Sequence, residues 1–337
     1  MNFSKTLLEW YTHNKRVFPF REKKDAYSIW LSEIMLQQTR TQTVIEYYNR
    51  FISLFPDVFA LADAKEETVL KAWEGLGYYS RARNLLKCAK AIANLYEGTF
   101  PKDAHALEKL PGIGPYTAAA IASIAYDEKY PAMDGNLTRV FARILGMRED
   151  VTIPSNRRTL YNFALSKMPN TGCGDFNQAL MDIGATLCTV GTPRCERCPL
   201  SRFCDAFLAG DAGELPILPR KKPLKVEHLC VLIVTSQNKV YVEKRTEKLL
   251  QGLYVFVLCN EGEEQQALKK RNLHAGYQSD LGNAKHIFTH KVWQMKVMHY
   301  IADDCDERFV DLETLDALPF PTAVTHALKH AKKLIGK

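Results

Sequence analysis

The sequence LPGIGPYTAAAIASIAYDEKYPAMDGN, residues 110–136, decides how this chain folds. Gly112 and Gly114 permit a tight turn with exposed backbone, and Pro115 suits the first position of a helix that we expect over residues 116–125. A glycine turn directly before a helix N-terminus points several unpaired N–H groups at one place, which suits a phosphate. The alternative is an ordinary connection between two helices, and the turn alone does not decide between them.

The bulk composition bounds the class of protein. A length of 337 residues favours two domains, and an apolar content of 46% is ample for their cores. The net charge of +7 favours a polyanionic partner. The sequence shows neither a membrane-length apolar run nor a signal-like leader. We therefore expect a cytoplasmic protein with no membrane partner, nucleoid-associated if it is bacterial.

Two acidic side chains are candidates for acid–base chemistry. Glu33 lies within the apolar run IWLSEIML (29–36), where burial would raise its pKa and let it donate a proton near neutral pH. A solvent-facing position on an amphipathic helix is the alternative. Asp134 precedes an expected helix over residues 135–145, so it is either a structural N-cap or a carboxylate kept ionised by the helix terminus. A protonated Glu33 and an ionised Asp134 would form the pair that glycosidic bond cleavage requires.

Four of the nine cysteines cluster with the spacing Cys188-x6-Cys195-x2-Cys198-x5-Cys204. In a chain with no sign of secretion, such cysteines are metal ligands or core residues rather than disulfides. A structural zinc site more often shows two paired C-x2-C motifs, and here one pair is present. The spacing therefore favours a [4Fe-4S] cluster, with zinc as the alternative.

An aromatic and basic loop interrupts a helical run over residues 66–97. The segment GLGYY (75–79) is followed by Arg81 and Arg83. Such a loop could wedge an aromatic ring between bases while the arginines hold phosphates. Helix punctuation with tyrosines in the core is the alternative.

The composition changes after Cys204. Residues 205–225 are rich in Gly and Pro and read as a linker, either a solvated connector or a stripe that follows DNA phosphates. Beyond it, the runs HLCVLIVTS, KVYVEKR, GLYVFVLC and VWQMKVMHYIA predict strands, and residues 321–335 predict a helix. The basic residues of the stripe are Arg220, Lys221, Lys222 and Lys225.

Together these motifs resemble the endonuclease III superfamily of helix-hairpin-helix base-excision enzymes, and more narrowly the MutY-type adenine DNA glycosylases. The resemblance implies a multidomain α and α+β fold. An all-helical helix-hairpin-helix glycosylase domain, 1–204, would end in the iron-sulfur loop, and a linker, 205–225, would lead to a Nudix-like α/β domain, 226–337. The motifs that carry the resemblance are WLSEIMLQQT (30–39), GLGYYSRARNL (75–85), LPGIGPYTAAAI (110–121), DGNLTRVFAR (134–143) and the cysteine spacing.

The same resemblance implies an enzyme that excises adenine mispaired with 8-oxoguanine or guanine in duplex DNA, by hydrolysing the N-glycosidic bond. We expect it to act as a monomer on double-stranded DNA and to carry a [4Fe-4S] cluster. Thr289 stands where the family usually has serine, in a Phe-Thr-His segment, and Phe20 replaces a usual tryptophan. The implied catalytic residues are Glu33, Asp134, Tyr116 and Asn136; the implied DNA-binding residues are Gln37, Tyr78, Gly112, Gly114, Arg21, Thr289 and His290; the implied metal ligands are Cys188, Cys195, Cys198 and Cys204.

Tyr116 separates two branches of the superfamily. Strand-cutting relatives carry a lysine at this position, because forming a Schiff base needs an amine. The resemblance therefore implies a monofunctional enzyme whose Tyr116 hydroxyl lies near the sugar and assists Asp134. Two alternatives remain. Tyr116 and the long C-terminal domain argue against a strand-cutting pyrimidine-lesion glycosylase, and the presence of Glu33 and Asp134 argues against a cluster-bearing DNA-binding protein without chemistry.

Overall fold

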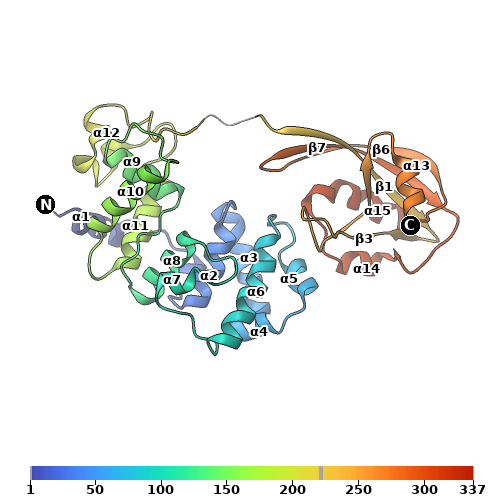
Figure 1. Cartoon of the computed structure of the whole chain (residues 1–337), viewed down its shortest axis with the longest axis horizontal. Helices are drawn as coiled ribbons and strands as arrows, with labels where there is room; N and C mark the ends of the chain where they lie inside the picture. The colour runs from blue at the N-terminus through green and yellow to red at the C-terminus, as the bar shows by residue number, and fades with distance from the viewer. Residues whose placement is uncertain (1, 220–222, 337) are drawn as a thin grey trace. The chain divides into compact units, whose positions relative to one another are not determined.

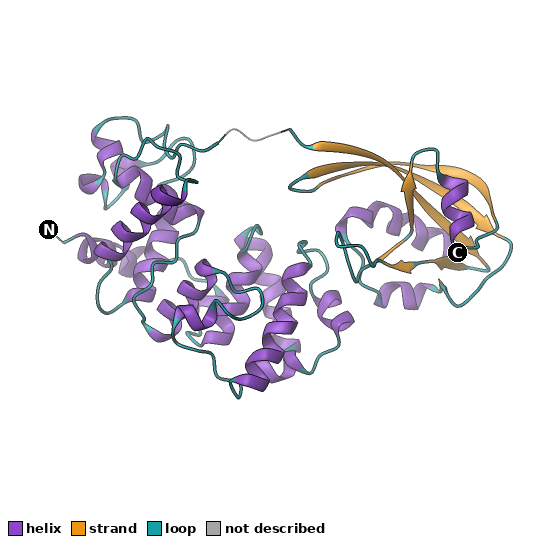
Figure 2. Cartoon of the chain, viewed as in Figure 1, coloured by secondary structure: helices purple, strands orange, loops and turns teal. Residues whose placement is uncertain are grey.

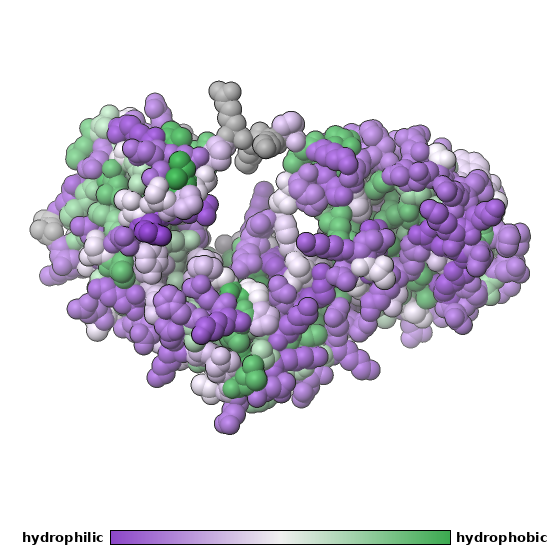
Figure 3. All heavy atoms as spheres, viewed as in Figure 1, coloured by the Kyte–Doolittle hydropathy of each residue, from purple (hydrophilic) through white to green (hydrophobic). Residues whose placement is uncertain are grey.

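The computed structural model describes residues 2–219 and 223–336. Arg220, Lys221 and Lys222 of the predicted basic stripe therefore lie outside the described residues. No helix in the described part of the chain is both long and apolar enough to cross a bilayer. The surface seen in Figure 3 is mostly hydrophilic, with apolar side chains scattered over it.

The chain divides into two compact units. The helical unit comprises Met1–Asp63 and Asn84–Lys221, and the sheet-bearing unit comprises Ala64–Arg83 and Lys222–Lys337. Every described strand belongs to the sheet-bearing unit (Figure 1; Figure 2). This unit also includes one helix from the N-terminal half of the chain, Glu66–Ala72.

The first half of the chain is helical throughout. Its elements are α1 Phe3–Asn14, η1 Pro19–Arg21, α2 Ala26–Leu36, α3 Thr41–Leu54, α4 Val58–Ala62, α5 Glu66–Ala72, α6 Ser80–Leu95, α7 Ala104–Leu107, α8 Pro115–Tyr126, α9 Gly135–Ile144, α10 Pro154–Lys167 and α11 Cys173–Thr186. The cysteine loop adds η2 Cys195–Arg197, η3 Ser201–Phe203 and α12 Asp205–Leu208.

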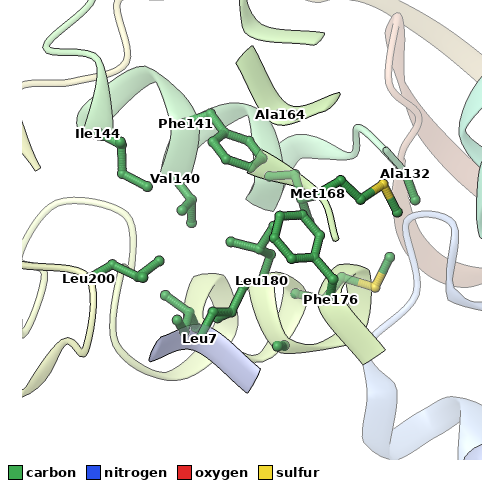
Figure 4. Packing of buried hydrophobic residues seen from close by; sticks show 14 of the residues in the cluster. Leu7, Ala132, Val140, Phe141, Ile144, Ala164, Met168, Phe176, Leu180 and Leu200 are labelled. Atoms are coloured by element: carbon green, nitrogen blue, oxygen red, sulfur yellow. The ribbon is translucent and has the colours of Figure 1, made fainter. Parts of the chain in front are cut away.

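The core of the helical unit is built from apolar faces that meet from α1, α8, α9, α10 and α11. Figure 4 shows aromatic and aliphatic side chains from α1, α9, α10 and α11 packed against one another, together with Leu200 of the cysteine loop. Helix α2 packs against α8 and is buried at every residue from Ala26 to Met35. A helix that is apolar on all sides belongs in a protein interior, so Glu33 cannot occupy the solvent-facing position that its sequence context left open. The buried residues labelled in Figure 4 are Leu7, Ala132, Val140, Phe141, Ile144, Ala164, Met168, Phe176, Leu180 and Leu200.

The turn between α7 and α8 uses its two glycines differently. Gly112 has a φ of 78°, and a Cβ there would lie 2.6 Å from the Cβ of Asn84, so both the backbone and the space exclude a side chain. Gly114 has an extended backbone with open space around it. Pro115 is the first residue of α8, as the sequence predicts.

The described part of the predicted linker packs on the helical unit. Ala206, Ala212 and Leu215 form a small buried cluster with cysteines of the loop. The N–H of Val151 donates to the carbonyl of Ile217 at 3.2 Å. The apolar residues between the glycines and prolines of this segment account for its packing. The boundaries 1–204, 205–225 and 226–337 stay a prediction.

The sheet-bearing unit is organised by the long strand β1. In the described residues the order of the main sheet is β6-β7-β1-β2-β8, and β5 also pairs with β1. The β1 and β7 strands are parallel, and the other pairs of this sheet are antiparallel. The strands are β1 Lys225–Ser236, β2 Lys239–Tyr241, β3 Glu243–Lys244, β4 Tyr254–Val255, β5 Val257–Asn260, β6 Ala275–Ile287, β7 Lys291–Ala302 and β8 Phe309–Val310, and the helices are α13 Glu264–Lys270, α14 Leu312–Ala317, η4 Thr322–Val324 and α15 Thr325–Ile335.

Candidate active site

A cavity of about 540 Å³ opens in the helical unit between α2, η1, α8, α9 and α11. These elements are distant in sequence and meet through the core described above. The cavity brings together six of the residues singled out from the sequence. They are Arg21, Glu33, Gln37, Tyr116, Asp134 and Asn136.

Glu33 is an acid poised near neutral pH. Its side chain lies in the buried helix α2, and burial raises its pKa to about 6. The nearby carboxylate of Asp134 also raises this pKa, while a hydrogen bond from Tyr116 and the positive charge of Arg21 lower it. The direction expected from the apolar sequence around Glu33 is confirmed.

Tyr116 links the acid to the wall of the cavity. It lies in the first turn of α8 and donates its hydroxyl proton to Oε2 of Glu33. Burial, together with the two neighbouring carboxylates, raises the pKa of this phenol well above its ordinary value. Tyr116 therefore remains a neutral hydrogen-bond donor.

Asp134 is the N-cap of α9, as its position in the sequence predicts. Its Oδ1 accepts the N–H of Leu137 at 2.7 Å, and its Oδ2 accepts the side-chain amide of Asn136 at 2.8 Å. Burial nevertheless raises the pKa of Asp134, against the lowering effect of these hydrogen bonds. The hydrogen bonds at the helix N-terminus favour the ionised carboxylate, as expected of this position, but desolvation is the larger effect on the pKa. That Asp134 acts as an ionised carboxylate stays a prediction.

Arg21 is held in place by a residue that sequence reasoning missed. Asp182 of α11 is completely buried, and its carboxylate pairs with Arg21 at 3.0 and 3.1 Å and with Nε of Arg16 at 2.7 Å. Both guanidinium groups also lie over the ring of Phe18, at 5.0 and 5.3 Å from its centroid. Phe20, at the position of the usual tryptophan, is buried and lines the same cavity.

Arg139 connects this site to the cysteine loop. Its Nη2 donates to Oδ1 of Asn136 at 2.9 Å and to the carbonyl of Gly184 at 2.7 Å. Its Nε donates to the carbonyl of Cys188 at 2.8 Å. One buried guanidinium therefore joins the side chain that orients Asp134 to the first cysteine of the loop.

The four clustered cysteines line one small, largely apolar cavity. Burial raises the pKa of Cys198 to about 12 and also raises the pKa of Cys195 and Cys204. Arg143 donates to Sγ of Cys188 at 3.2 Å. Buried thiolates are costly without a cation, so this all-sulfur donor set fits a positively charged metal centre. Among the described residues, no three His, Cys, Asp or Glu side chains are grouped to hold a single metal ion.

The remaining predicted DNA-binding residues lie outside the cavity. Tyr78 is 44% exposed in the loop before α6, with a left-handed φ of 47°. Thr289 and His290 form the turn between β6 and β7, next to Phe288, whose ring packs 4.9 Å from that of Trp293. Tyr78, Thr289 and His290 all belong to the sheet-bearing unit.

Comparisons with known proteins agree with this architecture. Residues 31–163 match the HhH-GPD superfamily of base excision DNA repair proteins, and residues 229–330 match the NUDIX domain. An adenine DNA glycosylase of Buchnera aphidicola subsp. Acyrthosiphon pisum is 32% identical over 99% of this chain and 98% of its own length. The chain belongs to the adenine DNA glycosylase family.

Other members of the family and solved structures extend the comparison. An adenine DNA glycosylase of Arabidopsis thaliana is 36% identical over 84% of this chain, which spans 54% of that relative. A solved thermostable thymine-DNA glycosylase is 30% identical over 61% of this chain and 95% of its own, with a TM-score of 0.56. A solved complex of endonuclease III with DNA, 19% identical over 61% of this chain and 94% of its own, has a TM-score of 0.52 and shows the fold alone.

Membership of this family confirms two expectations from the sequence. The fold is a helix-hairpin-helix glycosylase domain followed by a Nudix-like domain with a mixed sheet. The enzyme is a DNA glycosylase of base excision repair, and it acts on DNA.

Proposed function

We propose that this chain removes adenine mispaired with 8-oxoguanine or guanine from duplex DNA and leaves an abasic site. The observation that carries the proposal is the convergence of Glu33, Tyr116 and Asp134 on one cavity of the helical unit. Two carboxyl groups at such a site, one of them with a pKa near neutrality, suit cleavage of a glycosidic bond through a cationic sugar.

The reaction begins when the adenine nucleotide rotates out of the duplex into the cavity. Protonated Glu33 gives its proton to a ring nitrogen of the base, which makes the base a better leaving group. The N-glycosidic bond then breaks, and its electron pair leaves with the adenine. The developing positive charge on the sugar is stabilised by the carboxylate of Asp134, which Asn136 and the N–H of Leu137 orient.

Water completes the reaction by adding to the anomeric carbon, and the Glu33 carboxylate left by the first step takes up the proton that the water loses. Tyr116 assists Asp134 at the sugar. Its hydroxyl lines the cavity, stays neutral and donates a hydrogen bond to Glu33. A phenol cannot form a Schiff base, so we propose that the enzyme is monofunctional and does not cut the strand. Lys24 also lines the cavity, but its amine pairs with Asp175 at 3.1 Å on an exposed face.

Duplex DNA is proposed to contact both units. Gly112 and Gly114 would bring backbone close to a phosphate at the N-terminus of α8, which no side chain caps in the described chain. Gln37 and Tyr78 would fill the stack around the mispair, and Arg21 would line the base pocket. Thr289 and His290 would read 8-oxoguanine, since the threonine hydroxyl both donates and accepts hydrogen bonds.

We further propose that Cys188, Cys195, Cys198 and Cys204 hold a [4Fe-4S] cluster. The support is an all-thiolate donor set that faces one cavity from a single loop. The bound cluster would cross-link a segment with little regular structure. Iron and sulfide measured at four each per chain, with a visible absorption band, is the expected result; one zinc per chain would identify the alternative metal.

Three further properties are proposed with the activity. The enzyme would act as a monomer, would lie in the cytoplasm near the nucleoid if the source is bacterial, and would keep adenine specificity in the helical unit. The decisive experiment incubates the protein with duplexes that carry adenine opposite each base in turn. We expect the enzyme to release adenine and the DNA strand to break only after alkali is added. Release should be fastest when the opposite base is 8-oxoguanine or guanine. Breaks without alkali, or release from normal A:T pairs at the same rate, would contradict the proposal.

A further inference from the structure

The loop that carries Tyr78 is held in an unfavourable conformation. Tyr78 has a φ of 47°, which non-glycine residues rarely adopt, and it lies next to Gly77 with a φ of 70°. A large aromatic side chain that is 44% exposed contributes little to the core. The geometry of this loop must therefore be imposed by its neighbours.

The neighbours of Tyr78 bind the main chain of Phe320. Tyr79 donates its hydroxyl proton to the carbonyl of Phe320 at 3.1 Å, and the same hydroxyl accepts the N–H of Gly75 at 3.3 Å. Oε1 of Glu74 accepts the N–H of Phe320 at 2.9 Å. Both backbone groups of one residue are thus satisfied by side chains that flank the loop.

A third side chain binds the main chain of the same segment, two residues before Phe320. Nζ of Lys71, in α5, donates to the carbonyl of Leu318 at 3.0 Å and pairs with the carboxylate of Glu74 at 2.7 Å. The segment 318–320 is in turn fixed to the sheet. The N–H of Tyr254 donates to the carbonyl of Pro319 at 3.0 Å.

The ring of Phe320 completes the anchorage. It is 2% exposed and stacks on the ring of Phe256 at 5.6 Å, inside the core of the sheet-bearing unit. A second close approach occurs at Gly252, where φ is 79° and a Cβ would lie 3.1 Å from Oε1 of Glu66 and 3.5 Å from Leu70. Helix α5 therefore packs tightly on the segment that leads into β4.

We propose that Glu74 and Tyr79 are positioning residues. By binding the main chain of Phe320, they fix the position of Tyr78, the side chain proposed to insert between bases as a wedge. The proposal rests on the proposed role of Tyr78 in the base stack. Under it, Tyr78 and the domain that reads the opposing base form one rigid body. Inserting a side chain between bases requires unstacking energy, so a wedge whose position is fixed beforehand loses less entropy on binding.

The test uses the full-length chain and measures single-turnover release of adenine opposite 8-oxoguanine. Tyr79→Phe removes the hydroxyl and should slow release about three- to tenfold, the range of one lost hydrogen bond. Tyr126→Phe is the matched control, because Tyr126 donates to the carbonyl of Phe100 at 2.9 Å within the helical unit. It should leave the rate unchanged.

A double-mutant cycle separates positioning from general stability. In a Tyr78→Ala background, Tyr79→Phe should change the rate by less than about twofold, because the side chain through which it acts is gone. An equal loss in both backgrounds would overturn the inference and leave the proposed role of Tyr78 intact. If Tyr78→Ala alone released adenine at the wild-type rate, the proposed role of Tyr78 would fail, and this inference with it.

Substitutions of Glu74 provide a second test, which can be carried out even if the Tyr79→Phe variant folds poorly. Glu74→Ala removes the acceptor for the N–H of Phe320 and should slow release by a similar factor. Glu74→Gln retains a carbonyl oxygen at this position and should restore most of the rate. Equal rates for the alanine and glutamine variants would contradict a positioning role.

Discussion

Asp182 fixes Arg21 through a two-point ion pair at 3.0 and 3.1 Å, although the two residues are far apart in the sequence. The carboxylate of Asp182 is fully buried and also accepts the main-chain N–H of Arg16 at 3.0 Å. Arg21 lines the cavity and lowers the pKa of Glu33. Asp182 therefore acts on the site through Arg21, without facing the substrate.

Replacing Asp182 should damage both stability and activity. Asp182→Asn leaves Arg16 and Arg21 without a counter-charge, and because both are partly exposed we expect a loss of about 2–3 kcal/mol in the free energy of unfolding. The rate of adenine release should fall as Arg21 loses its position. Urea unfolding and single-turnover kinetics measure the two effects.

Asp175→Asn provides the control on the same helix. Asp175 pairs with Lys24 in an exposed position, so its loss should change the free energy of unfolding by less than about 0.5 kcal/mol. Equal destabilisation by the two substitutions would show that the buried ion pair between Asp182 and Arg21 stabilises the fold no more than the exposed pair does.

The pH dependence of the enzyme should follow Glu33. Its pKa of about 6 means that the acid form, required for protonating adenine, is lost above that pH. We expect kcat/KM to fall about tenfold per pH unit above this pKa. Glu33→Gln should abolish adenine release at every pH while duplex binding persists, and a Gln variant with near-normal turnover would remove Glu33 from the role of acid.

The free energy of unfolding should also depend on the protonation of Glu33, and it should decrease as the pH rises. The folded pKa of Glu33 lies above its ordinary value of 4.5, so the folded state binds the proton more tightly. The stabilisation is complete below pH 4.5 and is lost as pH rises through about 6, a change of about 2 kcal/mol. Thermal melts of the Glu33→Gln variant should lack this component, so the variant should be the more stable protein at pH 7.

Tyr116→Lys should introduce strand cleavage. The new amine would lie where the phenol of Tyr116 now contacts Glu33, near enough to the sugar to form a Schiff base. Adenine release should slow, because a cationic amine beside Glu33 favours the ionised carboxylate over the acid form that protonates adenine. Borohydride trapping and gels run without alkali detect the intermediate and the nick. Tyr116→Phe loses the hydrogen bond to Glu33 without gaining an amine and should not nick; a lysine variant with no nicking at all would contradict this placement.

The residues that could be predicted from the sequence are those with a local signal. Glu33 stands out as a charge inside an apolar run, and the four cysteines stand out by their spacing. Asp182 lies in a similar run, ALMDIGA, but its partners Arg16 and Arg21 come from the other end of the domain, so the sequence gives no hint of the pair.

Elements without an intrinsic preference were also beyond prediction. Strand β6, AGYQSDLGNAKHI, contains glycines, Asp and Asn, which are unfavourable in strands. It forms because the apolar β7 pairs with it along nearly its whole length. The helix α9 shows the opposite case, since its capping Asp134 and apolar spacing agree, and its predicted bounds differ from the observed ones by one residue.

The two hairpin glycines should separate folding from DNA binding. Gly112→Ala forces a side chain into a left-handed backbone at φ 78° and against Asn84, so we expect a loss of about 1–3 kcal/mol in the free energy of unfolding. Gly114→Ala has an extended backbone and open space, so stability should be unchanged or slightly higher. Its methyl group would stand where a phosphate approaches the N-terminus of α8, so duplex affinity should fall although the fold is intact. Thermal melts and fluorescence anisotropy with a mispaired duplex measure the two properties, and full affinity in the Gly114→Ala variant would show that DNA does not approach the protein at this turn.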